Sequence, residues 1–204
     1  MLLVDVDAFC KLAHWKILPH LSKLLGIPWQ NIATISSLRF RARRALAKPD
    51  GKLFRNTEAA KLVLETMELL GQLDEPSPET LALFEGVPQI DVGEAILLSL
   101  VADEPSLHIL TGDKKALRSL ASHECANLVS GRVITLEQIM LLCLERMGKS
   151  WFKKHVCPFK EIDTSIRVVM GGLCNNSVYE LRLGLTSYIN EIARLRTPPL
   201  LKNT

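Results

Sequence analysis

The stretch LHILTGDKKALRSL, residues 107–120, joins an apolar run to a helical pattern through one acidic residue. Residues 107–111 have the composition of a short strand, and residues 114–121 have the apolar spacing of a helix. Asp113 stands at the junction, where a carboxylate either caps the new helix or faces a site at the end of the strand. The stretch therefore predicts a strand followed at once by a helix, and it leaves both roles open for Asp113.

The same order of strand and helix recurs on either side of this stretch. We expect further strands at 2–6, 32–36 and 132–135. The expected helices cover 7–25 with a break at Pro19, 37–47, 57–70, a short segment from 78, 91–102, and 136–147. Strands that alternate with helices predict a parallel sheet in an α/β sandwich.

Composition restricts the class of protein. The chain has 204 residues, of which 48% are hydrophobic, and a net charge of +3. This length and composition predict a folded protein whose core needs neither metals nor disulfides. The longest uncharged apolar stretches, such as residues 95–102, are too short to span a bilayer. A net charge this small does not by itself indicate nucleic acid.

The cysteines and the start of the chain indicate a cellular compartment. The five cysteines stand at 10, 125, 143, 157 and 174, without C-x-x-C spacing. Their odd number and scatter predict reduced thiols in a cytoplasmic protein. The first residues include Asp5 and Asp7 and no basic segment, so we do not expect a signal peptide.

The texture of the sequence changes after Gly148. Residues 149–160, KSWFKKHVCPFK, are basic and aromatic, and the remainder predicts two helices separated by a break at 171–176. We therefore divide the chain into a domain at 1–147 and a helical extension with a basic bias at 148–204. We expect Trp151, Phe152 and Phe159 to pack the extension onto the domain.

Acidic residues mark three of the predicted junctions. They are Asp5 and Asp7 after the first strand, Asp91 and Glu94 at a helix start, and Asp113. Each alone is typical of a helix cap, and Asp91 with Glu94 has the spacing of a capping box. Together they predict more, because the carboxyl ends of parallel strands lie at one edge of a sheet. If the strands before Asp5 and Asp113 are neighbours, the carboxylates converge there.

A cluster of carboxylates repels itself, and a divalent cation among them relieves the repulsion. Hard oxygen ligands of this kind suit Mg²⁺ or Mn²⁺. The acidic residues therefore predict a cation site at the edge of the sheet.

Four stretches, in their order and spacing, resemble a PIN domain, a small metal-dependent ribonuclease fold, over residues 1–147. LLVDVDAFCKL (2–12) resembles the first strand and first acid of that family, and DVGEAILLSLVA (91–102) resembles its "GEA" helix. LHILTGDKKAL (107–117) matches the strand, hydroxyl residue and acid that close the site, and RVITLEQIMLL (132–142) resembles the last strand and helix.

The resemblance implies a fold and a set of site residues. The fold is a three-layer α/β/α sandwich with a central parallel sheet, followed here by the extension. Asp5, Glu94 and Asp113 are the implied catalytic acids and ligands of Mg²⁺ or Mn²⁺. Asp7 is a further implied ligand, and Thr111 is a weaker match to the family's hydroxyl residue.

The implied activity is metal-dependent endoribonuclease cleavage of RNA phosphodiester bonds. A toxin of a toxin–antitoxin pair and an RNA-processing nuclease are both open. RNA is the expected partner, and an antitoxin or other protein partner and a homo-oligomer also stay open.

The chain departs from the family on one helix. PIN domains usually carry another acid on the helix after the second strand, whereas SLRFRARRALA (37–47) has arginines and no acid. Glu58 or Glu65 on the next helix is a candidate replacement. Arg39 and Arg43 share one helical face and, with Lys114, are candidate RNA-binding residues. A solvated helix face is the alternative for the arginines.

Three other interpretations compete with the nuclease. A catalytically impaired PIN-like module that binds RNA or protein is favoured by the missing acid and opposed by the retained ones. The DVD of residues 5–7 also resembles the first box of haloacid-dehalogenase phosphatases, but Ala8, Phe9 and Leu117 depart from their motifs. DVDAF resembles an acidic box of lesion-bypass polymerases, for which the chain is too short.

Overall fold

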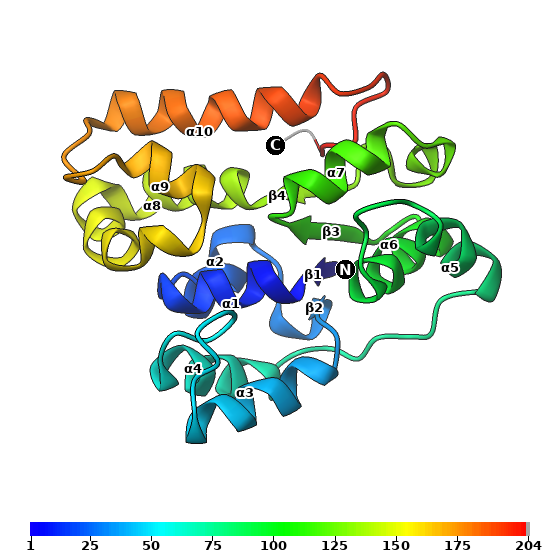
Figure 1. The fold of residues 1–204 in the computed structure, drawn as a ribbon, viewed down its shortest axis with the longest axis horizontal. Helices are drawn as coiled ribbons and strands as arrows, with labels where there is room; N and C mark the ends of the chain where they lie inside the picture. Colours follow the sequence, from blue (N-terminus) through cyan, green and yellow to red (C-terminus); the bar gives the residue numbers. More distant parts are fainter. Residues whose placement is uncertain (203–204) are drawn as a thin grey trace.

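The computed structural model describes residues 1–202, which form a mixed α/β fold around a four-stranded parallel sheet (Figure 1). The strands are β1 (Leu2–Val4), β2 (Ile32–Ala33), β3 (His108–Thr111) and β4 (Val133–Thr135). Their order across the sheet is β2-β1-β3-β4. All the predicted strands are present, and each is shorter than its apolar run because the flanking residues turn into the next element.

Helices occupy most of the remaining chain. The α-helices are α1 (Val6–His14), α2 (Leu21–Leu25), α3 (Ser37–Ala47), α4 (Thr57–Met67), α5 (Pro78–Glu85), α6 (Val92–Asp103), α7 (Lys114–Ala121), α8 (Leu136–Val156), α9 (Thr164–Met170) and α10 (Val178–Ala193). The 3₁₀ helices are η1 (Leu18–His20), η2 (Trp29–Asn31), η3 (Glu124–Val129) and η4 (Cys157–Ile162). None of the helices within 1–202 is both long and apolar enough to cross a membrane.

Glycine and proline set several helix boundaries. Pro19 lies in η1, between α1 and α2, and Gly26 ends α2 with a φ of 67°. These two positions break and close the helix that the sequence predicts over 7–25. Gly148 has a φ of 81° inside α8, where it joins two helical segments. The helix predicted to stop at 147 therefore continues, after a kink, to Val156.

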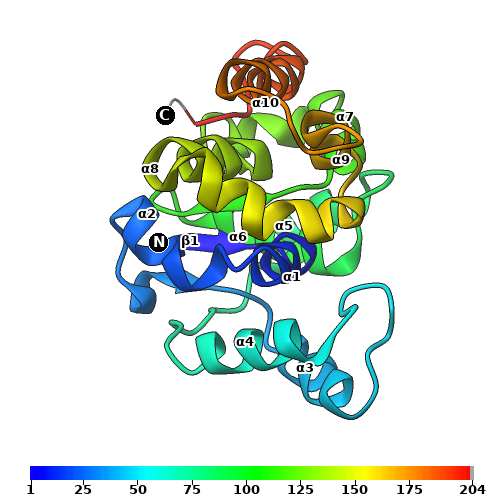
Figure 2. The same cartoon turned by 90° about the vertical axis from the view of Figure 1, so that its left-hand side faces the viewer.

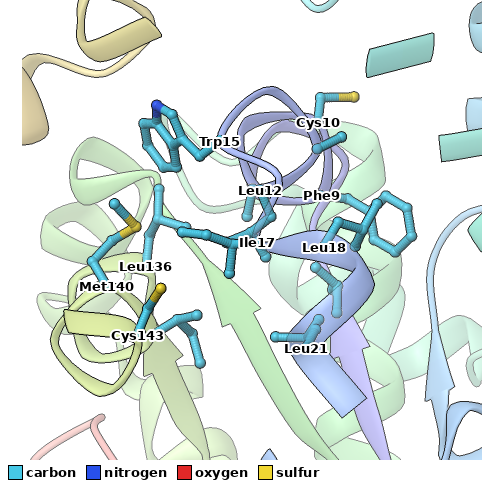
Figure 3. Close-up of a cluster of buried hydrophobic side chains, with 14 of the residues drawn as sticks. Phe9, Cys10, Leu12, Trp15, Ile17, Leu18, Leu21, Leu136, Met140 and Cys143 are labelled. Atoms are coloured by element: carbon cyan, nitrogen blue, oxygen red, sulfur yellow. The ribbon is translucent and has the colours of Figure 1, made fainter. Parts of the chain in front are cut away.

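Two clusters of buried side chains cover the two faces of the sheet. Alternate strand residues point to opposite faces, so Leu2 and Val4 join one cluster and Leu3 joins the other. The first cluster lies under α1, α3, α4 and α8. Figure 3 shows Trp15 and Ile17, which follow α1, beside Leu136 of α8. The second lies under α5, α6 and α7. Burial on both faces explains why the strands are continuously apolar.

The extension packs on this core. Phe152 is fully buried in the first cluster, with Trp151 and Phe159 packed against it, as predicted. The indole Nε1–H of Trp15 donates to the carbonyl oxygen of Phe159 at 3.1 Å. Figures 1 and 2 show α10 at one end of the molecule and the α3–α4 pair at the other.

The end of the described chain returns to the sheet. Leu201 forms a parallel bridge with Val133 of β4, and the N–H of Lys202 donates to the Val133 carbonyl oxygen at 2.7 Å. This segment covers the edge of β4 that would otherwise expose its hydrogen-bonding groups.

The expectation of five reduced thiols is wrong for two of the cysteines. Cys157 and Cys174 form a disulfide, with their Cα atoms 6.2 Å apart, whereas Cys10, Cys125 and Cys143 are free. The bond links the start of η4 to the loop before α10. The sequence separation of 17 residues did not predict this disulfide. The two cysteines meet only because α9 folds back between them.

Candidate functional site

The first and last predicted acids begin helices at the same edge of the sheet. Strands β1 and β3 are neighbours, with Val4 opposite Leu110. The backbone N–H of Asp5 also donates to the Leu110 carbonyl oxygen at 2.9 Å. The condition for convergence of these acids, that the two strands are neighbours, is thus met, and α1 and α7 start side by side.

Asp5 and Asp113 are helix caps. Asp5 Oδ2 accepts a hydrogen bond from the N–H of Ala8 at 3.3 Å. Asp113 Oδ1 accepts from the N–H groups of Lys115 and Ala116 at 2.7 and 2.9 Å. Each cap satisfies N–H groups that the first turn of a helix leaves without partners.

Asp91 and Glu94 form the predicted capping box of α6. Asp91 Oδ1 accepts from the N–H of Glu94 at 2.8 Å, and Glu94 Oε2 accepts from the N–H of Asp91 at 3.1 Å. In Asp5, Asp113 and both box residues only one carboxylate oxygen takes part in capping. The other accepts no hydrogen bond from any of residues 1–202.

One cavity of about 490 Å³ collects these side chains. Its acidic lining residues are Asp5, Asp7, Asp91, Glu94 and Asp113. The structure therefore brings together all four predicted metal-binding acids. It adds Asp91, which the sequence indicated only as a cap. The signal for Asp91 was its position in the same first helical turn as Glu94.

The cavity raises the pKa of Asp5 to about 7. Burial of the carboxyl group is the main cause, and the charge of Asp7 is the next. The hydrogen bond from Ala8 opposes this rise, and the charge of Asp91 adds to it. Desolvation and like charges both disfavour the ionised carboxylate, so the carboxyl group of Asp5 is partly protonated near neutral pH.

Glu94 behaves in the same way. Burial raises its pKa to about 8, although the hydrogen bond from the Asp91 N–H lowers it. The charges of Asp5, Asp113 and Asp91 raise it further. This mutual influence shows that the carboxylates sense one another across the cavity. A cluster of carboxylates that repel one another is stabilised either by protonation or by a bound cation.

Carboxylate oxygens are the kind of donor that hard divalent cations prefer. Within residues 1–202 no three or more His, Cys, Asp or Glu side chains form a ready-made metal site. Mg²⁺ commonly takes only one or two carboxylates and completes its shell with water and substrate phosphate, so a more open arrangement suits it. The side chain of Thr111 takes part in a local hydrogen bond, in which its hydroxyl oxygen accepts from the N–H of Asp113 at 3.1 Å.

The arginines of α3 differ in whether they form ion pairs. Arg41 lines the cavity and is exposed, and it forms no ion pair within residues 1–202. Arg43 is exposed and likewise unpaired within the described chain. Arg39 pairs with Glu68, its Nη1 lying 2.6 Å from Oε1.

Lys114 is also engaged inside the protein, because its Nζ lies 2.5 Å from Oε1 of the buried Glu137. The two candidate replacements for the missing acid lie elsewhere. Glu58 and Glu65 line a different cavity, on α4. Asp91 is the additional acid that does face the site.

Sequence reasoning also missed a contact from the extension. Lys11 Nζ lies 2.6 Å from Asp7 Oδ2 and 2.8 Å from Asp163 Oδ2. Burial alone raises the pKa of Asp163, but the charges of Lys11 and Lys114 outweigh it and hold that pKa at about 2. A separation of 152 residues between Lys11 and Asp163 leaves no sequence signal for this contact.

Comparison of the chain with protein-family models, with curated proteins and with solved structures finds no match.

Proposed function

We propose that this protein is a Mg²⁺- or Mn²⁺-dependent endoribonuclease of the PIN type. The observation that carries the proposal is the cavity at the carboxyl edge of the parallel sheet, lined by five carboxylates. The proposal includes a three-layer PIN-like sandwich over residues 1–147. The helices on both faces of the sheet support that arrangement.

Asp5, Glu94 and Asp113 are the proposed catalytic acids, with Asp7 beside them. The carboxylate oxygens that the helix caps leave free are the donors proposed to hold the cation. A bound divalent cation supplies Lewis-acid stabilisation of the charge that develops on the phosphate and lowers the pKa of water. The acids are proposed to hold that cation.

Arg41 is the proposed phosphate contact on the rim of the cavity. A guanidinium group donates two parallel hydrogen bonds to phosphate oxygens, and this geometry orients the phosphate as well as neutralising it. Arg41 is exposed and unpaired within residues 1–202, so no internal ion pair has to break before it binds. RNA is the proposed substrate because the PIN-like arrangement of acids is typical of ribonucleases.

The same arginine favours a second candidate function. Arg41 lies on α3, where the family pattern has an acid, and it faces the carboxylates in the cavity. If its charge takes the place of a cation, the protein is a catalytically impaired PIN-like module that binds RNA or protein.

Cleavage of a circular single-stranded RNA tests the proposal, because a circle has no ends for an exonuclease. The wild type should linearise it with Mn²⁺ or Mg²⁺ and stop with EDTA. Asp5→Asn and Asp113→Asn should abolish cleavage, since Asn keeps the capping oxygen and removes the charge.

Asp74→Asn is the matched control, because Asp74 is an exposed carboxylate outside the acidic cavity. It should cleave like the wild type. Equal cleavage by all four proteins would show a contaminating nuclease and would leave the binding module standing. Binding of RNA and Mn²⁺ without any cleavage would favour the binding module directly.

A further inference from the structure

The extension is fastened to the edge of the acidic cavity. Lys11 on α1 joins Asp7 at the cavity to Asp163, which precedes α9, at 2.6 and 2.8 Å. Ser165 Oγ lies 2.6 Å from Asp163 Oδ1 and 2.5 Å from Glu137 Oε1. Asp163, Ser165 and Glu137 are all buried. These contacts hold the start of α9 in place against α1 and α8.

A second cavity, of about 440 Å³, lies against the start of α9. It shares Asp7 and Asp113 with the acidic cavity. Its remaining walls come from α7 and from the extension, including Lys115, Thr164 and Tyr188. The two cavities thus flank the same pair of acids. A single-stranded RNA that passes over these acids enters both cavities.

The side chains of the second cavity differ from those of the first. Lys115 is exposed and forms no ion pair within residues 1–202, so its ammonium group is available to an anion. Three other cations of this cavity are already engaged: Lys11 with Asp7 and Asp163, Lys114 with Glu137, and Arg118 with Glu191. Lys115 is therefore the basic residue of this cavity that binds a phosphate without first breaking an ion pair.

Tyr188 of α10 adds an aromatic wall. Its ring is half-buried, and Lys114 Nζ lies 5.7 Å from the ring centroid. The Tyr188 hydroxyl makes no hydrogen bond to any of residues 1–202, so the ring is placed by packing and not by a polar contact. Sites for single-stranded nucleic acids combine a cation for the backbone with an aromatic ring on which a base stacks.

We infer that this second cavity binds the nucleotide next to the cleaved bond of a single-stranded RNA. Tyr188 stacks its base, and Lys115 contacts its phosphate. This inference rests on the proposed function, since it takes the acidic cavity as the place of cleavage. It gives the extension a role in substrate binding that residues 1–147 do not fill alone.

Binding of a fluorescein-labelled single-stranded RNA 12-mer, followed by anisotropy in EDTA, tests the inference without cleavage. Tyr188→Ala should weaken binding by about five- to 150-fold, the range for loss of one stacked base. Tyr188→Phe should keep the affinity within about twofold, because the ring remains. Lys115→Ala should weaken binding and make the slope of log affinity against log salt shallower by about 0.7, the value for one lost phosphate contact on a single strand.

Two matched controls lie on the extension and outside both cavities. Tyr179→Ala removes an exposed ring from the same helix as Tyr188, and Lys153→Ala removes an exposed cation from α8. Both should bind like the wild type. Tyr188→Leu keeps apolar packing and replaces Tyr188→Ala if the smaller side chain unfolds the protein.

The outcomes separate the inference from the proposed function. Unchanged binding in Tyr188→Leu and Lys115→Ala, with cleavage that still requires Asp5, would overturn the second cavity and leave the nuclease intact. Loss of binding in those variants, with no cleavage by the wild type under any metal, would retain the RNA site and overturn the nuclease. Failure of the wild type to bind RNA in EDTA would overturn the inference.

Discussion

The backbone N–H of Asp5 donates a hydrogen bond to the carbonyl oxygen of Leu110 at 2.9 Å. This bond extends the ladder between β1 and β3 by one residue and fixes the start of α1 beside the start of α7. Asp113 caps α7 three residues after Leu110. One carboxylate oxygen of each acid binds its helix, and the other accepts no hydrogen bond from the residues that the structure describes, 1–202. Capping and participation in the acidic cavity are therefore compatible roles for Asp113.

Binding of Mn²⁺ at pH 7 should release protons. Burial and neighbouring acids raise the pKa of Asp5 to about 7 and that of Glu94 to about 8, so both carry protons at this pH. A cation binds the ionised forms and displaces about one proton or more. Titration calorimetry in two buffers of different ionisation enthalpy measures this number. It should fall towards zero at pH 9.5, and a lack of buffer dependence at pH 7 would contradict the metal site.

Without metal, the wild type should lose stability as the pH rises from about 4 to 8. The folded pKa of Asp5 lies above its unfolded value of 3.8, so the folded state binds the proton more tightly. The stabilisation is complete below the unfolded pKa and is lost as the pH rises through the folded one. Asp5→Asn carries no charge at this position, so its melting temperature should exceed that of the wild type at pH 8. Its decline with pH should be smaller than that of the wild type, because only the raised pKa of Glu94 still contributes to it.

Asp103→Asn is a control of opposite sign. Slight burial raises the pKa of Asp103, but hydrogen bonds from Ser77 and Thr80 outweigh it and lower the pKa overall. The stabilisation from Asp103 is present above its unfolded pKa and is lost as the pH falls. Asp103→Asn should therefore lower the melting temperature at neutral pH. A rise for both variants would indicate a general effect of removing negative charge.

Short-range sequence signals were enough to predict the sheet and the acidic edge. The segments before Asp5 and Asp113 are apolar on both faces, which is typical of strands buried in a parallel sheet. The capping box of Asp91 with Glu94 was also predicted, and it forms. These features depend on residues three or four positions apart, so the sequence displays them directly.

Contacts between distant segments were not predictable in this way. The pairing of Lys11 with Asp163 depends on where the extension packs, and the Cys157–Cys174 disulfide depends on how α9 folds back inside the extension. The place of Arg41 in the acidic cavity depends on the direction in which α3 leaves β2. Spacing along the chain carries no information about such directions, and only the packed structure gives them.

Arg41→Glu should strengthen Mn²⁺ binding in calorimetry if this arginine stands in for a cation in the acidic cavity. The change removes a positive charge from the rim and adds an oxygen donor to the lining. The matched control is Arg43→Glu, which makes the same charge change on the same helix but outside the cavity lining. Equal Mn²⁺ affinities of Arg41→Glu and the wild type would exclude the substitution of arginine for metal.

Arg39 and Arg43 should differ in RNA binding, although they share a helix. Arg43 is exposed and unpaired within residues 1–202, so Arg43→Ala should make the salt slope for single-stranded RNA shallower by about 0.7 if it contacts a phosphate. Arg39 is held by Glu68, so Arg39→Ala should leave the slope unchanged and cost at most about 1 kcal/mol of stability. A solvated helix face with no RNA contact predicts unchanged slopes in both variants.

Lys11 should be essential to the attachment of the extension. Its side chain is 14% exposed and lies between Asp7 and the buried Asp163, so Lys11→Met leaves the Asp163 carboxylate without its closest cation. Removal of one partner from a buried ion pair costs about 3–5 kcal/mol. Chemical denaturation at pH 7 measures this loss. Lys61→Met is the control, because the pair of Lys61 with Glu65 is exposed on both sides and should contribute less than about 1 kcal/mol.

Asp163→Asn should rescue much of that loss when combined with Lys11→Met. Asn has no charge to leave unpaired, and its oxygen still accepts the capping hydrogen bond from the N–H of Ile166 that Asp163 Oδ1 now accepts at 3.0 Å. The gap between Lys11→Met and the wild type should also narrow as the pH falls towards 3. Lys11 holds the pKa of Asp163 at about 2 against the effect of burial, and without Lys11 the carboxyl group takes up a proton at a higher pH. Equal losses in Lys11→Met and in the double variant at pH 7 would show that Lys11 acts through packing of its methylene chain and not through its charge.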